Sequence, residues 1–140
     1  MNRIFILLTL LVFTACSQSE KQEAPSSATL TTKIDALLDA DMYTDALELL
    51  GDQAESQEVL KLREKTHLNY GLFLEYRNNA VTDMRDKMTT AMYQYIEVLK
   101  INRNNEKAIT EVEQILGIYS TFPNRQPDPE VMEELEKLGF

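Results

Sequence analysis

Cysteine and histidine are the residue types that most often supply nucleophiles or soft metal ligands, and each occurs once here, as Cys16 and His67. One histidine without a second histidine or a further cysteine is too small a ligand set for a transition-metal site. Neither a glycine-rich phosphate loop nor a G-x-S-x-G turn occurs. Acidic pairs such as Glu133 and Glu134 lie in charged segments typical of a solvated helix face. We therefore expect no enzyme activity, no metal ion and no cofactor, with His67 a packing or surface residue.

Cys16 directly follows a hydrophobic segment at residues 4–15, which begins after Arg3 and ends in the small pair Thr14-Ala15. The segment is shorter than the roughly 18 to 20 apolar residues that cross a bilayer. A basic residue, a short apolar stretch and small residues, in this order, are typical of a secretory signal peptide. A buried core strand is the alternative, which the N-terminal position and the polar residues after Cys16 disfavour. Residues 1–15 are therefore predicted to be a signal peptide that is removed.

The segment LVFTAC, residues 11–16, resembles the lipobox of bacterial lipoproteins, in which a hydrophobic residue and two small ones precede an acylated cysteine. The resemblance implies cleavage after Ala15, a diacylglycerol thioether on Cys16 and a third acyl chain on the new amino group. Two or more acyl chains anchor a protein stably. Ser17, in place of aspartate, implies the periplasmic side of the outer membrane, although retention in the inner membrane stays open. The alternative is ordinary secretion with Cys16 as an unpaired thiol.

Residues 16–29 contain the predicted lipid attachment point and a polar segment rich in Ser, Gln, Glu and Pro. Such a segment cannot bury enough apolar surface to offset the entropic cost of ordering it. We expect a disordered tether whose ends lie about 20 Å apart, and which would keep the folded part close to the membrane.

The chain is acidic, with a formal net charge of −9 at pH 7, and the predicted loss of Arg3 makes the mature chain one unit more negative. Nucleic-acid binding calls for basic patches, so nucleic acid is not expected as a partner. The same charge disfavours direct contact between the domain and anionic headgroups. We expect the lipid bilayer to be bound through acylated Cys16, while the acidic surface indicates either solubility or a basic protein partner.

Residues 30–140 are predicted to form one all-α domain of about six antiparallel helices. Apolar side chains recur there at spacings of three and four, and no segment alternates at period two. Ser56, Asn105 and Asp128 are predicted to cap helix N-termini, and a proline suited to the first helical position follows Asp128. Gly51 is expected to end the second helix in a left-handed conformation.

Two segments of this domain resemble tetratricopeptide repeats (TPR), in which pairs of antiparallel helices stack in series. In DADMYTDALELL, Tyr43 and Ala46 match the aromatic residue and the buried alanine of a repeat's second helix. In TTAMYQYIEVLKINRNNEKA, Ala91 and Tyr95 match the same helix. The resemblance covers residues 30 to about 119 and implies two degenerate TPR-like helical hairpins with a capping pair. A non-repeating helical bundle stays open as the alternative.

Tyr70 and Gly71 match the bulky-then-small pair of a repeat's first helix, where glycine permits close helix contact. The family spacing then implies an insertion near residues 77–86, before a helix expected from about residue 82 to 101. In TPR proteins the first helices line a groove in which partner peptides lie. The register at Gly71 makes the following residues the candidate partner groove: Lys65, Leu68, Leu72, Tyr76, Lys107, Thr110, Glu111 and Gln114.

An apolar and aromatic groove rimmed by lysines suits an extended or helical peptide. The alternative for Leu68 and Leu72 is that they pack against neighbouring helices. Met84, Met88 and Met92 recur every four residues. We predict that this stripe faces the core, and the alternative is an adaptable binding surface.

The resemblances together imply a membrane-anchored periplasmic adaptor or scaffold with a protein partner that acts in envelope assembly. A sharper version is a pilotin-like chaperone of a secretin or pilus subunit. A hypothesis of another class is a structural lipoprotein that acts by self-association, as a homo-oligomer with the methionine stripe buried between copies. The sequence identifies neither the partner nor the oligomeric state, and it does not decide between the groove and the methionine face.

Overall fold

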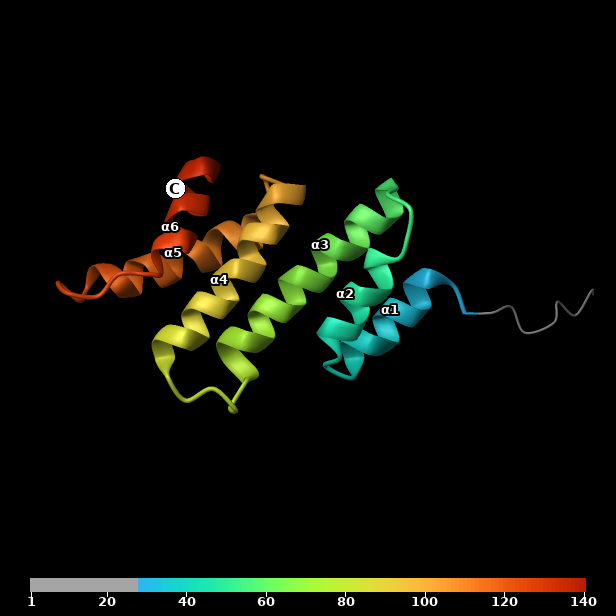
Figure 1. Cartoon of the computed structure of the whole chain (residues 1–140), viewed down its shortest axis with the longest axis horizontal. Coiled ribbons are helices and arrows are strands. Elements are labelled where there is room, and N and C mark those ends of the chain that lie inside the picture. The colour runs from blue at the N-terminus through green and yellow to red at the C-terminus, as the bar shows by residue number, and fades with distance from the viewer. Residues whose placement is uncertain (1–27) are drawn as a thin grey trace, which may run out of the picture.

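The computed structural model describes residues 28–140, and these form an all-α fold, as predicted (Figure 1). The predicted signal peptide, Cys16 and nearly all of the predicted tether lie outside the described residues. The helices, in chain order, are α1 (Leu30–Asp39), α2 (Tyr43–Gly51), α3 (Gln57–Leu72), the π-helical turn η1 (Phe73–Arg77), α4 (Met84–Ile101), α5 (Glu106–Ser120) and α6 (Pro129–Leu138). No strand occurs in the described part.

Side-chain caps start most of these helices, as predicted from the sequence. The side chains of Ser56, Asn105 and Asp128 accept hydrogen bonds from backbone N–H groups of α3, α5 and α6, which satisfies donors that have no partner within the helix. Asp83 does the same for α4, so this helix begins at Met84, slightly later than expected. Thr29 caps α1.

The prediction for Gly51 is confirmed in part: α2 ends at Gly51, but Gly51 does not adopt the expected left-handed conformation. Gly51 lies within the last turn of α2, and Asp52 ends this helix in an ordinary right-handed conformation. The last carbonyls are bonded without a left-handed residue: the N–H of Asp52 donates to the carbonyl of Glu48 and the N–H of Gln53 to that of Leu50, both at 3.3 Å. The guanidinium of Arg63, on α3, also donates to the carbonyl of Leu50, at 3.0 Å. A left-handed residue is therefore not required to satisfy the end of the helix. Among the described glycines, only Gly139, after α6, has a positive φ.

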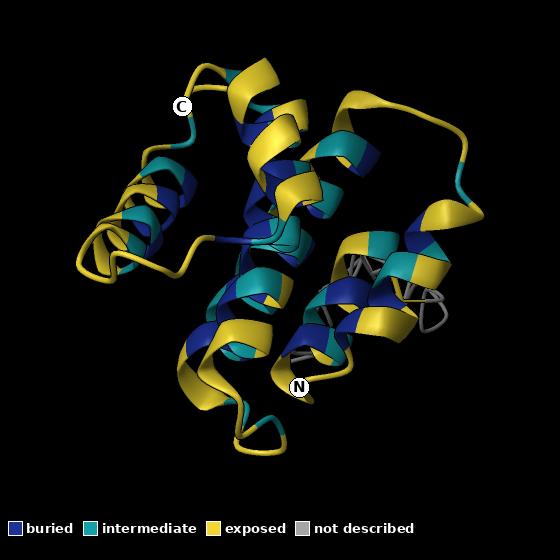
Figure 2. Ribbon diagram, turned by 60° about the vertical axis from the view of Figure 1, so that its left-hand side comes forward, coloured by how far each residue is buried: buried dark blue, intermediate teal, exposed yellow. Residues whose placement is uncertain are grey.

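The helices stack in series from the α1–α2 hairpin to the α5–α6 end, as Figure 1 shows. Helix α3 contacts α1, α2 and α4, and α4 in turn contacts α5 and α6. Buried residues face inward along the stack (Figure 2) and form two apolar clusters. The cluster between α1, α2 and α3 includes Ile34 and Leu50, and the larger cluster between η1, α4, α5 and α6 includes Met92. Tyr70 and Phe73 pack against both clusters and so join them.

Helices α3 and α4 are in close contact, where small residues were expected. A Cβ atom at Gly71 would lie only 2.5 Å from Cε1 of Tyr95, so the tyrosine ring lies directly against the α3 backbone. Ala91 on α4 is fully buried. Tyr43 and Ala46, the matching pair on α2, are buried as well.

Candidate functional site

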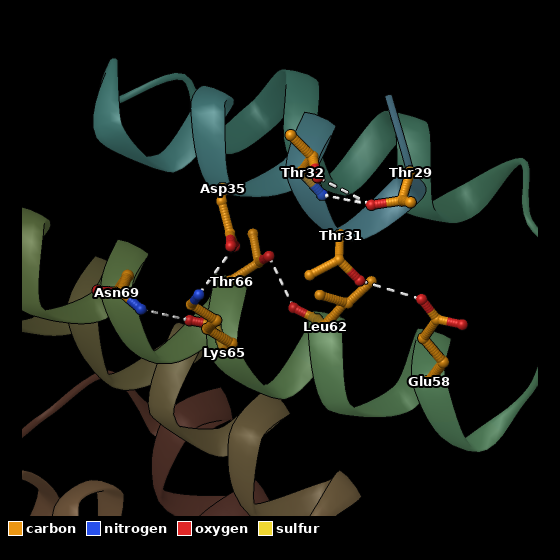
Figure 3. A network of polar contacts seen from close by, with 9 residues as sticks. All are labelled: Thr29, Thr31, Thr32, Asp35, Glu58, Leu62, Lys65, Thr66 and Asn69. Atoms are coloured by element: carbon orange, nitrogen blue, oxygen red, sulfur yellow. Dashed lines mark hydrogen bonds and ion pairs between the residues drawn. The ribbon is translucent and has the colours of Figure 1, made fainter. Parts of the chain in front are cut away.

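The predicted groove residues come from α3, η1 and α5, and the structure places them in two polar groups with apolar residues between. Lys65 belongs to the first group, between α1 and α3. Its ammonium lies 2.8 Å from Oδ1 of Asp35, and Thr31 of α1 donates to Glu58 of α3 at 3.0 Å (Figure 3). Lys65 thus pairs with Asp35 of α1, and the side chains of both residues remain partly exposed.

The second group joins η1 to α5 around Tyr76. The Tyr76 hydroxyl donates to Oε2 of Glu111 at 2.6 Å and accepts from Nε2 of Gln114 at 2.9 Å. Glu111 is 1 % exposed and forms an ion pair with Lys107 one turn before it. Partial desolvation of the hydroxyl, and then its hydrogen bond to Glu111, raise the pKa of Tyr76. The structure therefore brings together four residues of the candidate partner groove: Tyr76 of η1 and Lys107, Glu111 and Gln114 of α5.

A buried carboxylate that the sequence analysis missed lies close to this group. Glu75 is 5 % exposed, and its Oε2 accepts a 2.7 Å hydrogen bond from the hydroxyl of Tyr95. Its Oε1 is buried and has no hydrogen-bond partner among the described residues. Burial raises the pKa of Glu75, and the charge of Glu111 raises it further. The sequence does contain a signal that Glu75 faces inward, because Glu75 follows the buried Gly71 by four residues.

Leu68 and Leu72 lie between the two polar groups and are partly buried, packed against the larger apolar cluster. Each therefore serves at least in part as packing, the alternative that the sequence left open. Tyr76 is the large side chain of the predicted groove that stays exposed, at 53 %. The groove face is consequently a mostly polar surface with one exposed aromatic ring.

The three methionines of the stripe differ in burial along α4. Met88 and Met92 are buried in the larger cluster, as predicted for a core stripe, whereas Met84 is 60 % exposed. Met84 and Met88 line a depression of about 290 Å³ between the start of α4 and the end of α5. Ile118 and Phe122, both exposed, form its other apolar wall.

A second depression, of about 700 Å³, adjoins the first and continues onto α6. The two share Arg85, Asn124 and Gln126, and the second also contains the exposed side chains of Met132 and Phe140. We call this continuous area the C-terminal apolar surface, defined by Met84, Arg85, Ile118, Phe122, Asn124, Arg125, Gln126, Met132 and Phe140. Most of the large hydrophobic residues that are exposed in the described chain lie on it.

The two arginines of the C-terminal apolar surface are not neutralised by the described residues. Arg85 and Arg125 are both exposed and form no ion pair there. The guanidinium of Arg125 lies 5.4 Å from the centre of the Phe122 ring. Three acids line the same depressions: Asp83, whose carboxylate caps α4, and Glu133 and Glu136 of α6, of which Glu133 pairs with Lys137. The surface thus combines apolar side chains with charged groups of both signs along its edges.

A third depression, near the α1–α2 turn, is polar and internally paired. Arg77 donates to Oδ1 of Asp41 at 2.7 Å and to the hydroxyl of Tyr43 at 2.8 Å. The Tyr43 hydroxyl also donates to Asp41, and this bond, followed by Arg77, lowers the pKa of Asp41. Burial and Asp41 raise the pKa of Tyr43 to about 12. The network ties the first hairpin to η1, which is a structural role.

His67 is partly buried on α3, and its Nδ1 lies 2.9 Å from Oε1 of Gln94 on α4. Within the described residues no group of three or more acidic, histidine or cysteine side chains is placed to hold a metal ion. None of the helices from residue 28 onward is both long and apolar enough to span a membrane. In comparisons with known proteins, no family model, no curated protein and no solved structure matched the chain.

Proposed function

We propose that this chain is a membrane-tethered adaptor that holds a protein partner at the cell envelope through its helical domain. The proposed location rests on the lipobox-like segment at residues 11–16, which supports a lipid anchor on Cys16 at the periplasmic side of the outer membrane. The TPR-like spacing of Tyr43, Ala46, Ala91 and Tyr95 supports a module whose ordinary use is protein binding.

The observation that carries the proposal is the C-terminal apolar surface. Phe122 is 46 % exposed and Met84 60 % exposed on an otherwise strongly charged protein, and both line the same depression. Adjoining exposed apolar side chains commonly mark a binding surface, whereas single ones do not. Methionine suits such a surface because its flexible side chain adapts to the partner.

The groove is a second candidate surface, because Tyr76 presents an exposed ring that is held in place by Glu111 and Gln114. An aromatic side chain fixed in this way loses little entropy when a partner binds. If the chain is a pilotin-like chaperone, either surface would bind one helix of the secretin or pilus subunit. A self-associating lipoprotein would bury the C-terminal apolar surface against a second copy.

Site-specific crosslinking in cells tests the proposal and locates the surface. A photoreactive phenylalanine analogue is placed at position 122, at position 76, or at the exposed control position of Lys61 on α3. We expect adducts with one discrete protein from position 122 and none from Lys61. Adducts from position 76 alone would move the binding site to the groove. Absence of any adduct from positions 122 and 76 would contradict the adaptor function.

A further inference from the structure

Two buried acids, Glu75 and Glu111, lie beside the exposed ring of Tyr76 and have one hydrogen-bond donor too few. Both oxygens of Glu111 are bonded, one by the Tyr76 hydroxyl and the other by the ammonium of Lys107. Glu75 accepts from the Tyr95 hydroxyl through Oε2 at 2.7 Å, whereas its buried Oε1 has no partner among the described residues. Three donors therefore serve four carboxylate oxygens, and the missing donor is at Oε1 of Glu75.

The charges around Glu75 do not balance if both acids are ionised. The ionisable groups that act on Glu75 are Tyr95 of α4, Glu111 and Lys107 of α5, and Tyr76 of η1 itself. Helix α3 also contacts η1 but adds no ionisable side chain to this group. Lys107 is the one cation of the group, and it is paired with Glu111. An ionised Glu75 would therefore be a buried charge without a counter-ion, which is far more costly than a buried neutral carboxylic acid.

A proton on Oε1 of Glu75 removes this imbalance. Glu75 is then neutral, and Glu111 keeps Lys107 as its counter-ion. None of the three depressions described above includes Glu75, so nothing indicates space at Oε1 for a larger cationic ligand. Burial and the charge of Glu111 both raise the pKa of Glu75, as expected when two carboxyl groups share one site. The geometry and the charges thus agree on a protonated Glu75.

The position of Glu75 on η1 connects its proton to the groove. Glu75 and Tyr76 are neighbours on this π-helical turn, which ends where the N–H of Asn78 donates to the carbonyl of Phe73 at 2.8 Å. Such π-turns are rare and occur frequently at functional sites. A mostly exposed connection, residues 78–83, follows η1, so η1 can rearrange without displacing α4. A movement of Glu75 towards water would therefore carry Tyr76 away from its partners on α5.

We propose that Glu75 is a proton-dependent switch of the candidate partner groove. With the proton bound, η1 holds Tyr76 against Glu111 and Gln114; when the proton is lost, η1 rearranges and Tyr76 leaves α5. Because protons are lost as pH rises, the groove has the described shape at lower pH and changes at higher pH. The switch is a property of the free chain, so it does not depend on the adaptor function.

The test is NMR spectroscopy of the full-length chain, detergent-solubilised, with ¹³C in the glutamate carboxyl groups and the tyrosine rings. Glu75→Gln and Tyr76→Phe assign the two signals, and the pH is varied from mildly acidic to mildly alkaline. We expect the Glu75 carboxyl carbon and the Tyr76 ring to shift with one common midpoint above the ordinary value of 4.5. Lys107→Gln removes the cation that favours ionised Glu75, so it should raise that midpoint.

Glu75→Gln should abolish the shift of the Tyr76 ring, whereas Glu113→Gln, at an exposed position of α5, should preserve it. A Glu75 midpoint at or below 4.5 would overturn the proposal, since Glu75 would then be ionised and hydrated. A Tyr76 ring that does not respond while Glu75 titrates would also overturn it, as would a response that persists in Glu75→Gln. If Glu75→Gln fails to fold, Lys107→Gln decides, because an unchanged or lowered midpoint contradicts the proposed charge balance. Crosslinking from positions 122 and 76 stays a separate test of the adaptor function.

Discussion

Cys16 is the residue on which the proposed location depends, and it lies outside the described part of the structure. If Cys16 carries the acyl chains, Cys16→Ser should abolish incorporation of labelled palmitate and cause the unprocessed precursor to accumulate, because processing follows acylation in the lipoprotein family. Radiolabelling and the electrophoretic mobility of the chain measure both effects. Ser19→Ala, in the same segment, should change neither. Normal cleavage and unchanged membrane extraction of Cys16→Ser would contradict the lipoprotein interpretation.

Glu75 is a buried acid whose ionised form lacks one partner, so its charge should reduce stability at neutral pH. Because the folded-state pKa is raised above the ordinary value of 4.5, the folded chain holds the proton more tightly than the unfolded chain does. The free energy of unfolding therefore decreases as pH rises from the ordinary value through the raised pKa, and the loss persists at higher pH.

Glu75→Gln cannot ionise and keeps an oxygen for the Tyr95 hydroxyl, so we expect it to stabilise the domain at pH 7. A gain of about 1 kcal/mol would raise the melting temperature by roughly 4 °C. Thermal unfolding measured from acid to neutral pH should also show a smaller decline for Glu75→Gln than for the parent. Glu113→Gln, at an exposed position of α5, should leave the decline unchanged. An identical pH dependence of Glu75→Gln and parent would contradict this account.

At the scale of the elements, the contact between α3 and α4 tests the helix register. Ala91 is fully buried, so Ala91→Leu should overpack this interface and reduce the free energy of unfolding by about 1–3 kcal/mol. Chemical denaturation measures the loss. Ala80→Leu makes the same chemical change at an exposed position in the connection before α4 and should cost far less. Equal losses from the two variants would show that Ala91 does not lie at a close helix contact.

The ends of the helices show which features can be predicted from residues that are close together in the sequence. Ser56, Asn105 and Asp128 were predicted as caps and act as caps, because a cap bonds to backbone only two or three residues away. α2 does end at Gly51, but the left-handed conformation expected there is absent, because backbone N–H groups of Asp52 and Gln53 bond the last carbonyls in ordinary turn geometry and Arg63 of the next helix adds a further donor. A partner that comes from another element leaves no local signal.

At the scale of the whole molecule, the stacked helices leave the C-terminal apolar surface uncovered within the described chain. The adaptor proposal predicts that the detergent-solubilised variant Cys16→Ser keeps a monomer mass as its concentration is raised, since the surface is reserved for another protein. Sedimentation equilibrium measures this mass. A mass that rises with concentration, and that returns to the monomer value in Phe122→Asp, would instead favour the self-associating lipoprotein.

The sequence by itself determined the all-α class, most helix starts and the burial of Ala91, Tyr95, Met88 and Met92, whereas its prediction that Met84 also faces the core is wrong. These features follow from spacings within one helix or from short-range hydrogen bonds, so a single segment contains the whole signal. The lipobox-like segment around Cys16 is likewise a local pattern, and its prediction of an anchor stays a prediction.

Only the tertiary structure decided which side chains meet. Tyr76 reaches Glu111 and Gln114 across two elements, and Met84, at the start of α4, shares a depression with Phe122, just after the end of α5. Period and spacing predict which face of a helix is apolar, but they do not show which neighbour covers it. At the α5–α6 end the described chain supplies no further helix to cover Met84 and Phe122, because α6 packs against α4 elsewhere and leaves this part of the surface exposed to solvent.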